Sequence, residues 1–276
     1  MSKEEIIGIK RHCLGSDGHG VTTLVAFHGC LLRCRYCLNP QCHSSFDPYR
    51  EMFPEQLMEI LKKDELYFIA TKGGVTFGGG EPLIKSEFIL NVLSLGAKKW
   101  HTTLETSLCA EKKHLEKLIP WIDEYIVDVK DMNSRIYQSY TGRRNSLMRS
   151  NLHYLIETGR ANQILCRLPL IPGYNTESDR QRSEEELIEM GITRFEKFSY
   201  IRRDTKLDAI ANTQIDGGQG LTGLPFIMGD RKKTIMTFED VKHYKKKKEE
   251  EKKVWEKFKK EFEKYRLRGI IVDEDE

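Results

Sequence analysis

Short runs rich in Val, Ile, Phe and Thr recur along the chain, and longer stretches with helical spacing of apolar residues lie between them. Residues of these types are typical of strands. The runs predict six strands, at residues 23–28, 74–78, 102–105, 125–129, 163–168 and 194–199. Strands that alternate with helices form a parallel sheet through right-handed crossovers. Six alternations are fewer than the eight of a closed barrel, so we expect an α/β fold with an open, partial barrel.

Helix boundaries are marked by residues that favour helix ends. Pro54 suits a first helical turn, Ser86 suits an N-cap, and Gly159 and Gly191 suit positions just past a C-terminus. The predicted helices are residues 54–62, 86–98, 111–119, 146–158 and 184–190. In such folds the functional loops follow the C-terminal ends of the strands, so we expect the chemistry there.

The C-terminal quarter differs from the rest of the chain. We expect the partial barrel at residues 1–205, a loop or insertion at 206–237, and a charged helix and tail at 238–276. The glycine-rich residues 216–223 lack the Lys-Ser/Thr pair of a phosphate loop and are interpreted as a plain loop. The final helix carries one apolar stripe on a Lys- and Glu-rich surface, which indicates a solvated helix, with a docking role as the alternative.

Composition narrows the class of protein. The net charge of +3 on 276 residues does not favour a nucleic-acid binder. No apolar run approaches the roughly 20 residues needed to cross a bilayer, and the N-terminus lacks the apolar core of a signal peptide, so we expect a cytoplasmic protein without a membrane partner. Seven cysteines in that compartment are expected to stay reduced, and three of them lie close together.

Cys30, Cys34 and Cys37 follow the first predicted strand with the spacing C-x3-C-x2-C. Thiolates in short loops of this kind hold iron–sulfur clusters. Three ligands leave one iron open to an outside ligand, which favours chemistry over structure. The alternative is a zinc site completed by Cys42 or His43.

With this spacing the chain resembles the radical S-adenosylmethionine (SAM) superfamily. The turn that contains Asp17, and the residues around Tyr36 and Asn39, are similar to those of the glycyl-radical-enzyme activating enzymes. The resemblance covers roughly residues 15–202. It implies a partial (β/α)6 radical SAM barrel, one [4Fe–4S] cluster on the three cysteines, and SAM bound by residues that include Tyr36 and Asn39.

Further motifs follow later strands. Gly78-Gly79-Gly80-Glu81-Pro82 follows the second strand, and its glycines allow close approach of a ligand to the backbone. Read alone, this segment is a Gly-rich turn. The resemblance implies the GGEP motif, with Glu81 and the glycine backbone on the amino group of SAM.

Asp128 and Lys130 follow the fourth strand and project to the same side. A structural ion pair is one interpretation. The resemblance places them on the ribose and carboxylate of SAM. It also implies a monovalent cation near Glu105, Thr106 and Asp128, although Glu105 stands where the cation-binding family member has Asp.

Arg167 follows in the fifth strand and is a fixed cation that can hold a carboxylate or shape the charge near the cluster. The resemblance makes it a catalytic and SAM-binding residue. It also implies a His near the end of the sixth strand, where this chain has Tyr200 and Arg202 instead. Asp17 is the residue expected to hold the loop of a partner protein.

The implied activity is that of an anaerobic radical SAM oxidoreductase. Flavodoxin or ferredoxin reduces the cluster, SAM is cleaved to methionine and a 5′-deoxyadenosyl radical, and the radical removes a hydrogen atom from a glycine of a glycyl radical enzyme. One alternative keeps this chemistry but acts on a peptide, a nucleotide or a small molecule. The other is a metal-binding interaction protein without catalysis.

Overall fold

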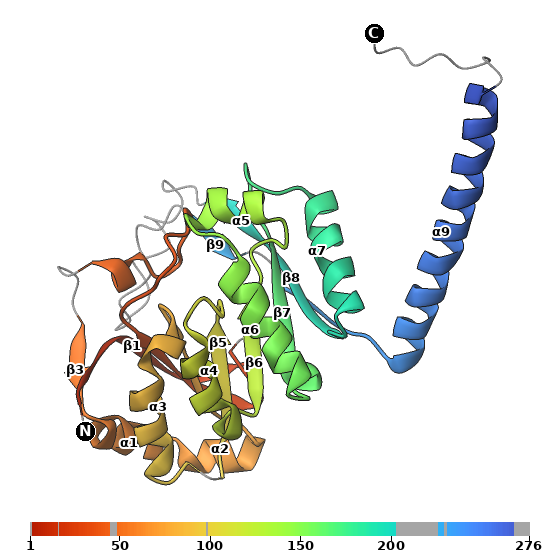
Figure 1. The fold of residues 1–276 in the computed structure, drawn as a ribbon. Helices are drawn as coiled ribbons and strands as arrows, with labels where there is room; N and C mark the ends of the chain where they lie inside the picture. The colour runs from red at the N-terminus through yellow and green to blue at the C-terminus, as the bar shows by residue number, and fades with distance from the viewer. Residues whose placement is uncertain are drawn as a thin grey trace. The chain divides into compact units, whose positions relative to one another are not determined.

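The protein is described here from a computed structural model, which places residues 2–15, 17–44, 49–97, 99–202, 226–228 and 231–267. The chain divides into two compact units, Met1–Thr234 and Ile235–Glu276. The first unit holds the sheet and its helices. In the second unit the structure describes helix α9 (Phe238–Leu267), which lies within residues 238–276, where a charged helix and tail are expected (Figure 1).

The centre of the sheet is formed by six parallel strands, and several of them are labelled in Figure 1. They pair side by side in chain order: β2 (Val21–Phe27), β4 (Gly74–Gly79), β5 (His101–Thr106), β6 (Glu124–Asp128), β7 (Ile164–Leu170) and β8 (Arg194–Arg202). Each of the six overlaps one predicted strand. The prediction of an α/β fold with an open, partial (β/α)6 barrel is therefore confirmed.

Four further strands extend this sheet and were not predicted. They are β1 (Glu4–Leu14), β3 (Arg50–Met52), β9 (Phe226–Met228) and β10 (Lys232–Ile235). β1 runs antiparallel to β2, β3 antiparallel to β1, and β9 antiparallel to β8. β9 and β10 fall in the range expected as a loop or insertion, while the glycine-rich residues 216–223 lie outside the described residues.

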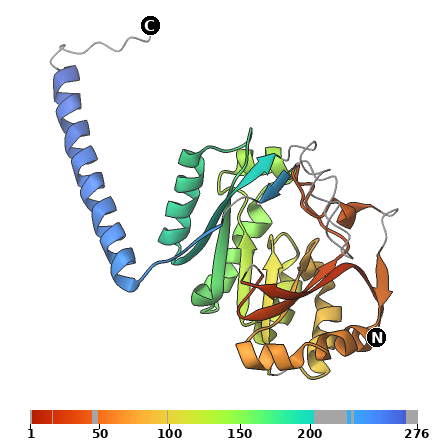
Figure 2. The same ribbon diagram turned by 180° about the vertical axis from the view of Figure 1, so that it is seen from behind.

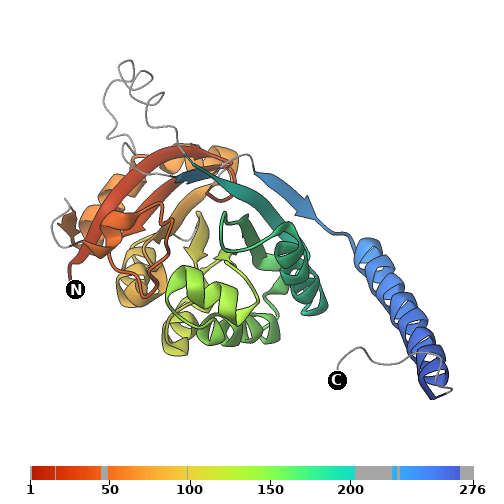
Figure 3. The same cartoon turned by 90° about the horizontal axis from the view of Figure 1, so that it is seen from above.

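Five of the helices match predicted ones: α1 (Pro54–Lys62), α3 (Ser86–Ser94), α4 (Lys112–Leu118), α6 (Ser146–Glu157) and α7 (Glu177–Glu189). Two more, α2 (Glu65–Thr71) and α5 (Ser134–Thr141), were not predicted. α7 begins earlier than expected because Thr176 and Asp179 form a capping box, in which each side chain accepts a hydrogen bond from the other's backbone N–H. The helices lie along one side of the sheet and around the outside of its curve (Figures 2 and 3).

The inner side of the curved sheet is filled in part by the turn before β2. Thr76 donates a hydrogen bond to the backbone carbonyl of Asp17. Gly18 has φ +120°, and a Cβ at this position would lie 2.9 Å from the Thr103 hydroxyl. Only glycine tolerates both the dihedral angle and the close approach. The turn therefore carries Asp17 into the interior of the barrel, where its side chain is buried.

A buried carboxylate, Asp64, joins β1, β2 and the start of α2. It accepts hydrogen bonds from Arg11 Nε (2.9 Å), His12 Nε2 (2.9 Å) and Thr23 Oγ1 (2.7 Å). A bulge in β1, with φ +58° at His12, turns two consecutive side chains toward the same carboxylate. Burial acts to raise the pKa of Asp64, but the hydrogen bonds from Arg11 and Thr23 outweigh it and lower the pKa.

We predict that Asp64→Ala lowers the free energy of unfolding by about 1–3 kcal/mol, because the buried Thr23 hydroxyl loses its acceptor and the solvent-exposed Arg11 and His12 lose their partner. Urea denaturation at pH 7, followed by circular dichroism, measures this change. The control is Glu51→Ala, which removes an exposed ion pair with Lys3 and is expected to cost less than about 1 kcal/mol. Equal effects of the two substitutions would contradict the role given to Asp64.

The stability of the wild type and of Asp64→Ala can also be compared as a function of pH. Since the pKa of Asp64 in the folded protein lies below its ordinary value of 3.8, the stabilisation is complete above that pH and is lost as the pH falls further. The difference in the free energy of unfolding between wild type and Asp64→Ala should therefore become smaller as the pH falls below 3.8. A difference that grows on acidification contradicts this assignment.

Candidate active site

One cavity lies where the parallel strands end. Its walls come from the loop after β2, from the ends of β4, β5 and β6, and from β8. The lining residues are Cys30, Leu32, Cys34, Cys37, Leu38, Asn39, Cys42, Gly79, Gly80, Glu105, Thr106, Ser107, Asp128, Lys130 and Tyr200. The carboxyl ends of parallel strands meet at one edge of a sheet, which is where this class of fold builds its ligand sites.

Most residues singled out from the sequence line this cavity. They are Cys30, Cys34, Cys37, Asn39, Gly79, Gly80, Glu105, Thr106, Asp128 and Lys130. The others do not line it: Asp17, Tyr36, Gly78, Glu81 and Arg167. Side chains from distant parts of the sequence thus share one space, and the second group supports it from behind or from its rim.

The loop after β2 carries the three cysteines and is fixed by backbone hydrogen bonds. Arg33 N donates to Thr141 O (2.8 Å) and Arg35 N donates to Tyr140 O (3.1 Å), both at the end of α5. The Arg33 guanidinium donates back to Cys30 O (2.9 Å). Hydrogen bonds to α5 and within the loop therefore fix its backbone without help from a ligand.

The thiols of this loop are crowded, and none of the seven cysteines, all of which lie in described parts of the chain, forms a disulfide. Burial raises the pKa of Cys30 to about 12 and that of Cys34 to about 11. A hydrogen bond with Cys42 lowers the pKa of Cys37 to about 6. Buried thiols are ionised readily when a metal cation compensates their charge, so this loop fits a thiolate-bound metal group.

Glu81 is fully buried behind the cavity wall. One carboxylate oxygen accepts hydrogen bonds from Leu83 N (3.2 Å) and Thr106 Oγ1 (2.5 Å). The other accepts from Ser107 N (3.0 Å) and Ser107 Oγ (2.5 Å). Burial raises the pKa of Glu81, while these hydrogen bonds oppose the shift. The four hydrogen bonds to Glu81 join the end of β4 to the end of β5. Thr106 and Ser107 line the cavity, whereas Glu81 does not.

Lys130 and Asp128 form an ion pair at the end of β6, with Nζ 2.9 Å from Oδ2. Burial opposes both charges. For Lys130 the neighbouring Asp128 outweighs burial and raises the pKa, and for Asp128 the Lys130 and Arg167 cations outweigh burial and lower the pKa. Both groups are therefore charged in a site that excludes much of the solvent.

Arg167 is 1% exposed and organises carboxylates around the inner side of the sheet. Its guanidinium contacts Glu105 Oε1 (2.7 Å), Glu196 Oε2 (2.5 Å) and, at 3.9 Å, Asp17 Oδ1. Burial acts to lower the pKa of Arg167, but Glu105 and the other carboxylates raise it overall. Arg167 thus holds Glu105 at the cavity wall.

Two carboxylate oxygens in the cavity wall indicate which groups of a ligand the cavity can bind. Glu105 Oε2 and Asp128 Oδ1 are buried and have no hydrogen-bond partner among the described residues. Buried polar atoms in folded proteins are normally paired, so such oxygens call for a ligand hydroxyl, an ammonium group or a metal cation. The residues present therefore fit a polar cofactor that carries donor groups.

Aromatic rings close one side of the cavity. Tyr140, Phe198 and Tyr200 pack with Ile171, and Tyr36 packs against this cluster. The Tyr36 ring lies 5.9 Å from that of Tyr140 and 6.1 Å from that of Tyr200, between ring centroids. Tyr200 lines the cavity at the end of the sixth parallel strand, near the position where the resemblance implies His. These rings exclude water from the region beside Cys34.

Sequence reasoning assigned no site role to Ser107, Leu32 and Leu38, which also line the cavity. Ser107 follows directly after β5, so its position after a strand was a usable signal. Leu32 and Leu38 flank the cysteines and could be read only as loop residues. Cys42 was considered only as a ligand for zinc, although it shares the cavity with the triplet.

The chain is similar in sequence to known proteins. A sequence profile described as the radical SAM superfamily matches residues 24–183. The choline trimethylamine-lyase activating enzyme of Oleidesulfovibrio alaskensis is 29% identical over 227 residues, covering 60% of this chain and 72% of that protein. The pyruvate formate-lyase-activating enzyme of Staphylococcus aureus is 31% identical over 170 residues, covering 59% of this chain and 67% of that protein.

A solved structure is also similar. A domain of the pyruvate-formate lyase-activating enzyme from Bacteroides vulgatus aligns with 42% of this chain and 71% of its own chain, at 31% identity and a TM-score of 0.37. The profile match spans more than half of the sequence and contains the three cysteines, the Gly79–Gly80 backbone and the Asp128–Lys130 pair. This chain belongs to the radical SAM superfamily.

Proposed function

We propose that this radical SAM enzyme generates a glycyl radical on a partner enzyme. The observation that carries the proposal is that the cysteine loop and the ends of β4, β5 and β6 line one cavity. The names of the two relatives described above, at about 30% identity, support the activating role. Flavodoxin or ferredoxin is the electron donor in this proposal.

Membership of the superfamily implies a [4Fe–4S] cluster and SAM. Cys30, Cys34 and Cys37 would hold the cluster and leave one iron for SAM. When bound, the cluster and SAM would supply the radical chemistry: with one electron from the donor they would give methionine and a 5′-deoxyadenosyl radical, which would take a hydrogen atom from the glycine Cα and leave as 5′-deoxyadenosine. The protein's part is to position these groups and to exclude competing reactants.

The charges of the cavity suit the polar ends of SAM. The Lys130 ammonium can pair with the carboxylate of SAM, and the Asp128 oxygen that lacks a partner among the described residues can accept from the ribose. The Gly79 and Gly80 backbone and Asn39, which donates to Gly79 O (3.2 Å), would face the amino end. A monovalent cation between Glu105, Thr106 and Asp128 would satisfy the remaining carboxylate oxygens.

Two predicted residues act through neighbours in this proposal. Glu81 has all its acceptor positions filled by protein donors, so we assign it to holding Thr106 and Ser107. Arg167 is assigned to holding Glu105 at the cavity wall. Asp17, which lies within reach of Arg167, keeps the assignment of receiving the glycine loop of the partner.

Gly80 couples the cysteine loop to the end of β4. Gly80 N donates to Phe27 O (2.9 Å) and Glu81 N donates to Gly29 O (2.8 Å). A Cβ on Gly80 would lie 2.1 Å from Gly29 O, immediately before Cys30. The two backbones are in contact, so a side chain there must displace the cysteine loop.

We predict that Cys34→Ala reduces both iron content and 5′-deoxyadenosine formation to background, because two thiolates cannot hold the cluster in place of three. The assay is anaerobic reconstitution with iron and sulfide, reduction with dithionite in the presence of SAM, and chromatography of the products. Cys166→Ala, which removes a fully buried thiol in β7, is the control and should keep both. Wild-type cleavage by Cys34→Ala would overturn the cluster assignment.

The activating role is tested by electron paramagnetic resonance. The reconstituted protein is incubated with SAM, reductant and either pyruvate formate-lyase or choline trimethylamine-lyase. A glycyl radical signal on one of them is expected. SAM cleavage without a signal on either would favour a peptide, nucleotide or small-molecule substrate.

We predict that Gly80→Ala weakens cluster loading by roughly 5- to 150-fold, which corresponds to a steric cost of about 1–3 kcal/mol. Gly8→Ala is the matched control, because a Cβ on Gly8 meets no atom within 4 Å. Iron and sulfide content after identical reconstitution measures the difference. Equal loading in the two variants would show that the contact with Gly29 is not needed.

A further inference from the structure

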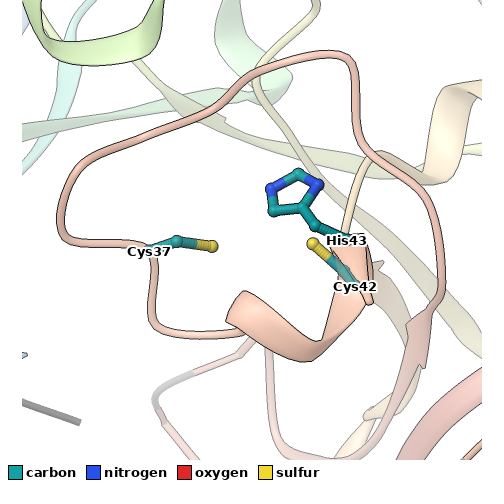
Figure 4. Close-up of side chains that lie close together, drawn as sticks. All are labelled: Cys37, Cys42 and His43. Carbon is teal, nitrogen blue, oxygen red and sulfur yellow. The ribbon is translucent and has the colours of Figure 1, made fainter. Parts of the chain in front are cut away.

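Cys42 and His43 lie beside the cysteine triplet, on a short 3-10 helix, Pro40–His43. The ligand atoms of Cys37, Cys42 and His43 all lie within 4.8 Å of one another (Figure 4). A tetrahedral zinc ion, with Zn–S distances of about 2.3 Å and Zn–N of about 2.0 Å, holds its ligand atoms roughly 3.5–3.8 Å apart. These three side chains therefore need only small movements to bind one ion.

The backbone around Cys42 is fixed from both directions. Cys42 N donates to Asn39 O (3.0 Å), and Cys42 O accepts from Gly29 N (2.9 Å). Asn39 is itself anchored on Gly79 O. The Cys42 side chain is 1% exposed and turns toward Cys37 (Figure 4). A ligand pair on a rigid, hydrogen-bonded segment is preorganised for binding.

We propose that Cys37, Cys42 and His43 form a site for a single thiophilic divalent cation, with Zn²⁺ as the ion that suits two thiolates and one imidazole. The fourth position stays open to water. Binding releases the protons of the two thiols. Because the [4Fe–4S] site also needs Cys37, zinc and the cluster exclude each other. The loop can therefore bind either Zn²⁺ or the cluster, but not both at once.

Binding of zinc would break a hydrogen bond between Arg33 and His43. Its guanidinium donates to His43 Nδ1 at 2.5 Å, so the neutral ring carries its proton on Nε2. A metal at Nδ1 replaces this contact, and a metal at Nε2 moves the ring proton to Nδ1, which also ends it. Arg33 is exposed and can turn into solvent while zinc is bound.

The alternative is that Cys42 is only a small buried apolar side chain, as many free cysteines are. Cys166 provides the comparison: it is fully buried, yet it belongs to no such group of ligands in the described part of the chain. The proposal differs from that alternative in requiring His43 as well as Cys42. It also requires that Cys30 and Cys34 take no part.

The test is titration of the metal-free full-length chain with Zn²⁺ under anaerobic conditions, in competition with a chromophoric chelator. We expect one ion per chain. Loss of an outer-shell partner alone costs about 10- to 100-fold in metal affinity, so Cys42→Ser and His43→Ala should each cost at least that much. Cys30→Ser, Cys34→Ser and the control Cys166→Ala should bind Zn²⁺ as the wild type does.

Cluster loading is the second readout, and it separates this proposal from the proposed function. Cys42→Ser and His43→Ala should load iron and sulfide normally, whereas Cys37→Ser should lose both metals. One equivalent of Zn²⁺ added first should block cluster formation in the wild type but not in His43→Ala. Unchanged zinc affinity in Cys42→Ser or His43→Ala, or zinc lost in Cys30→Ser or Cys34→Ser, overturns the site without touching the cluster assignment.

Discussion

The guanidinium of Arg167 is the charge on which the interior of the barrel depends. It is almost fully buried, and it is reached by Glu105 from β5, Glu196 from β8 and Asp17 from the turn before β2. A buried cation is tolerated only when its partners are close, and removing one partner leaves a buried charge uncompensated. One side chain therefore links β5, β7, β8 and that turn. Because Glu105 lines the cavity, this link also fixes part of the cavity wall.

The cavity is built by contacts between strands that are neighbours in the sheet. Glu81 leaves β4 and is held by residues at the end of β5, while Gly80 packs directly on Gly29 at the start of the cysteine loop. Each contact joins neighbouring parallel strands at their carboxyl ends. The cysteine loop is consequently positioned by strands that follow it by many residues in the sequence, so it cannot be formed by its own segment alone.

The six central strands could be predicted because β-branched and aromatic residues mark buried parallel strands without any long-range information. β1 could not be predicted in this way, because it carries many polar residues. Two of them, Arg11 and His12, are explained only by the bulge and by Asp64, which is distant in the sequence. In the site, the sequence indicates which residue types follow the strands. It does not indicate which way they turn. Glu81 was expected to face the ligand, yet its carboxylate turns to four protein donors, since these contacts arise from the pairing of β4 with β5.

The electrostatic pattern of the cavity also constrains what it can hold. Lys130 supplies a cation, and Glu105 and Asp128 each present a buried oxygen that lacks a partner among the residues placed by the structure. A purely anionic ligand would meet those oxygens unfavourably, and a purely cationic ligand would meet Lys130. A molecule with a carboxylate at one point and hydroxyl or ammonium donors at others satisfies all three groups at once. SAM has this distribution of groups, so the charges of the wall and the thiols of the loop favour the same cofactor on independent grounds.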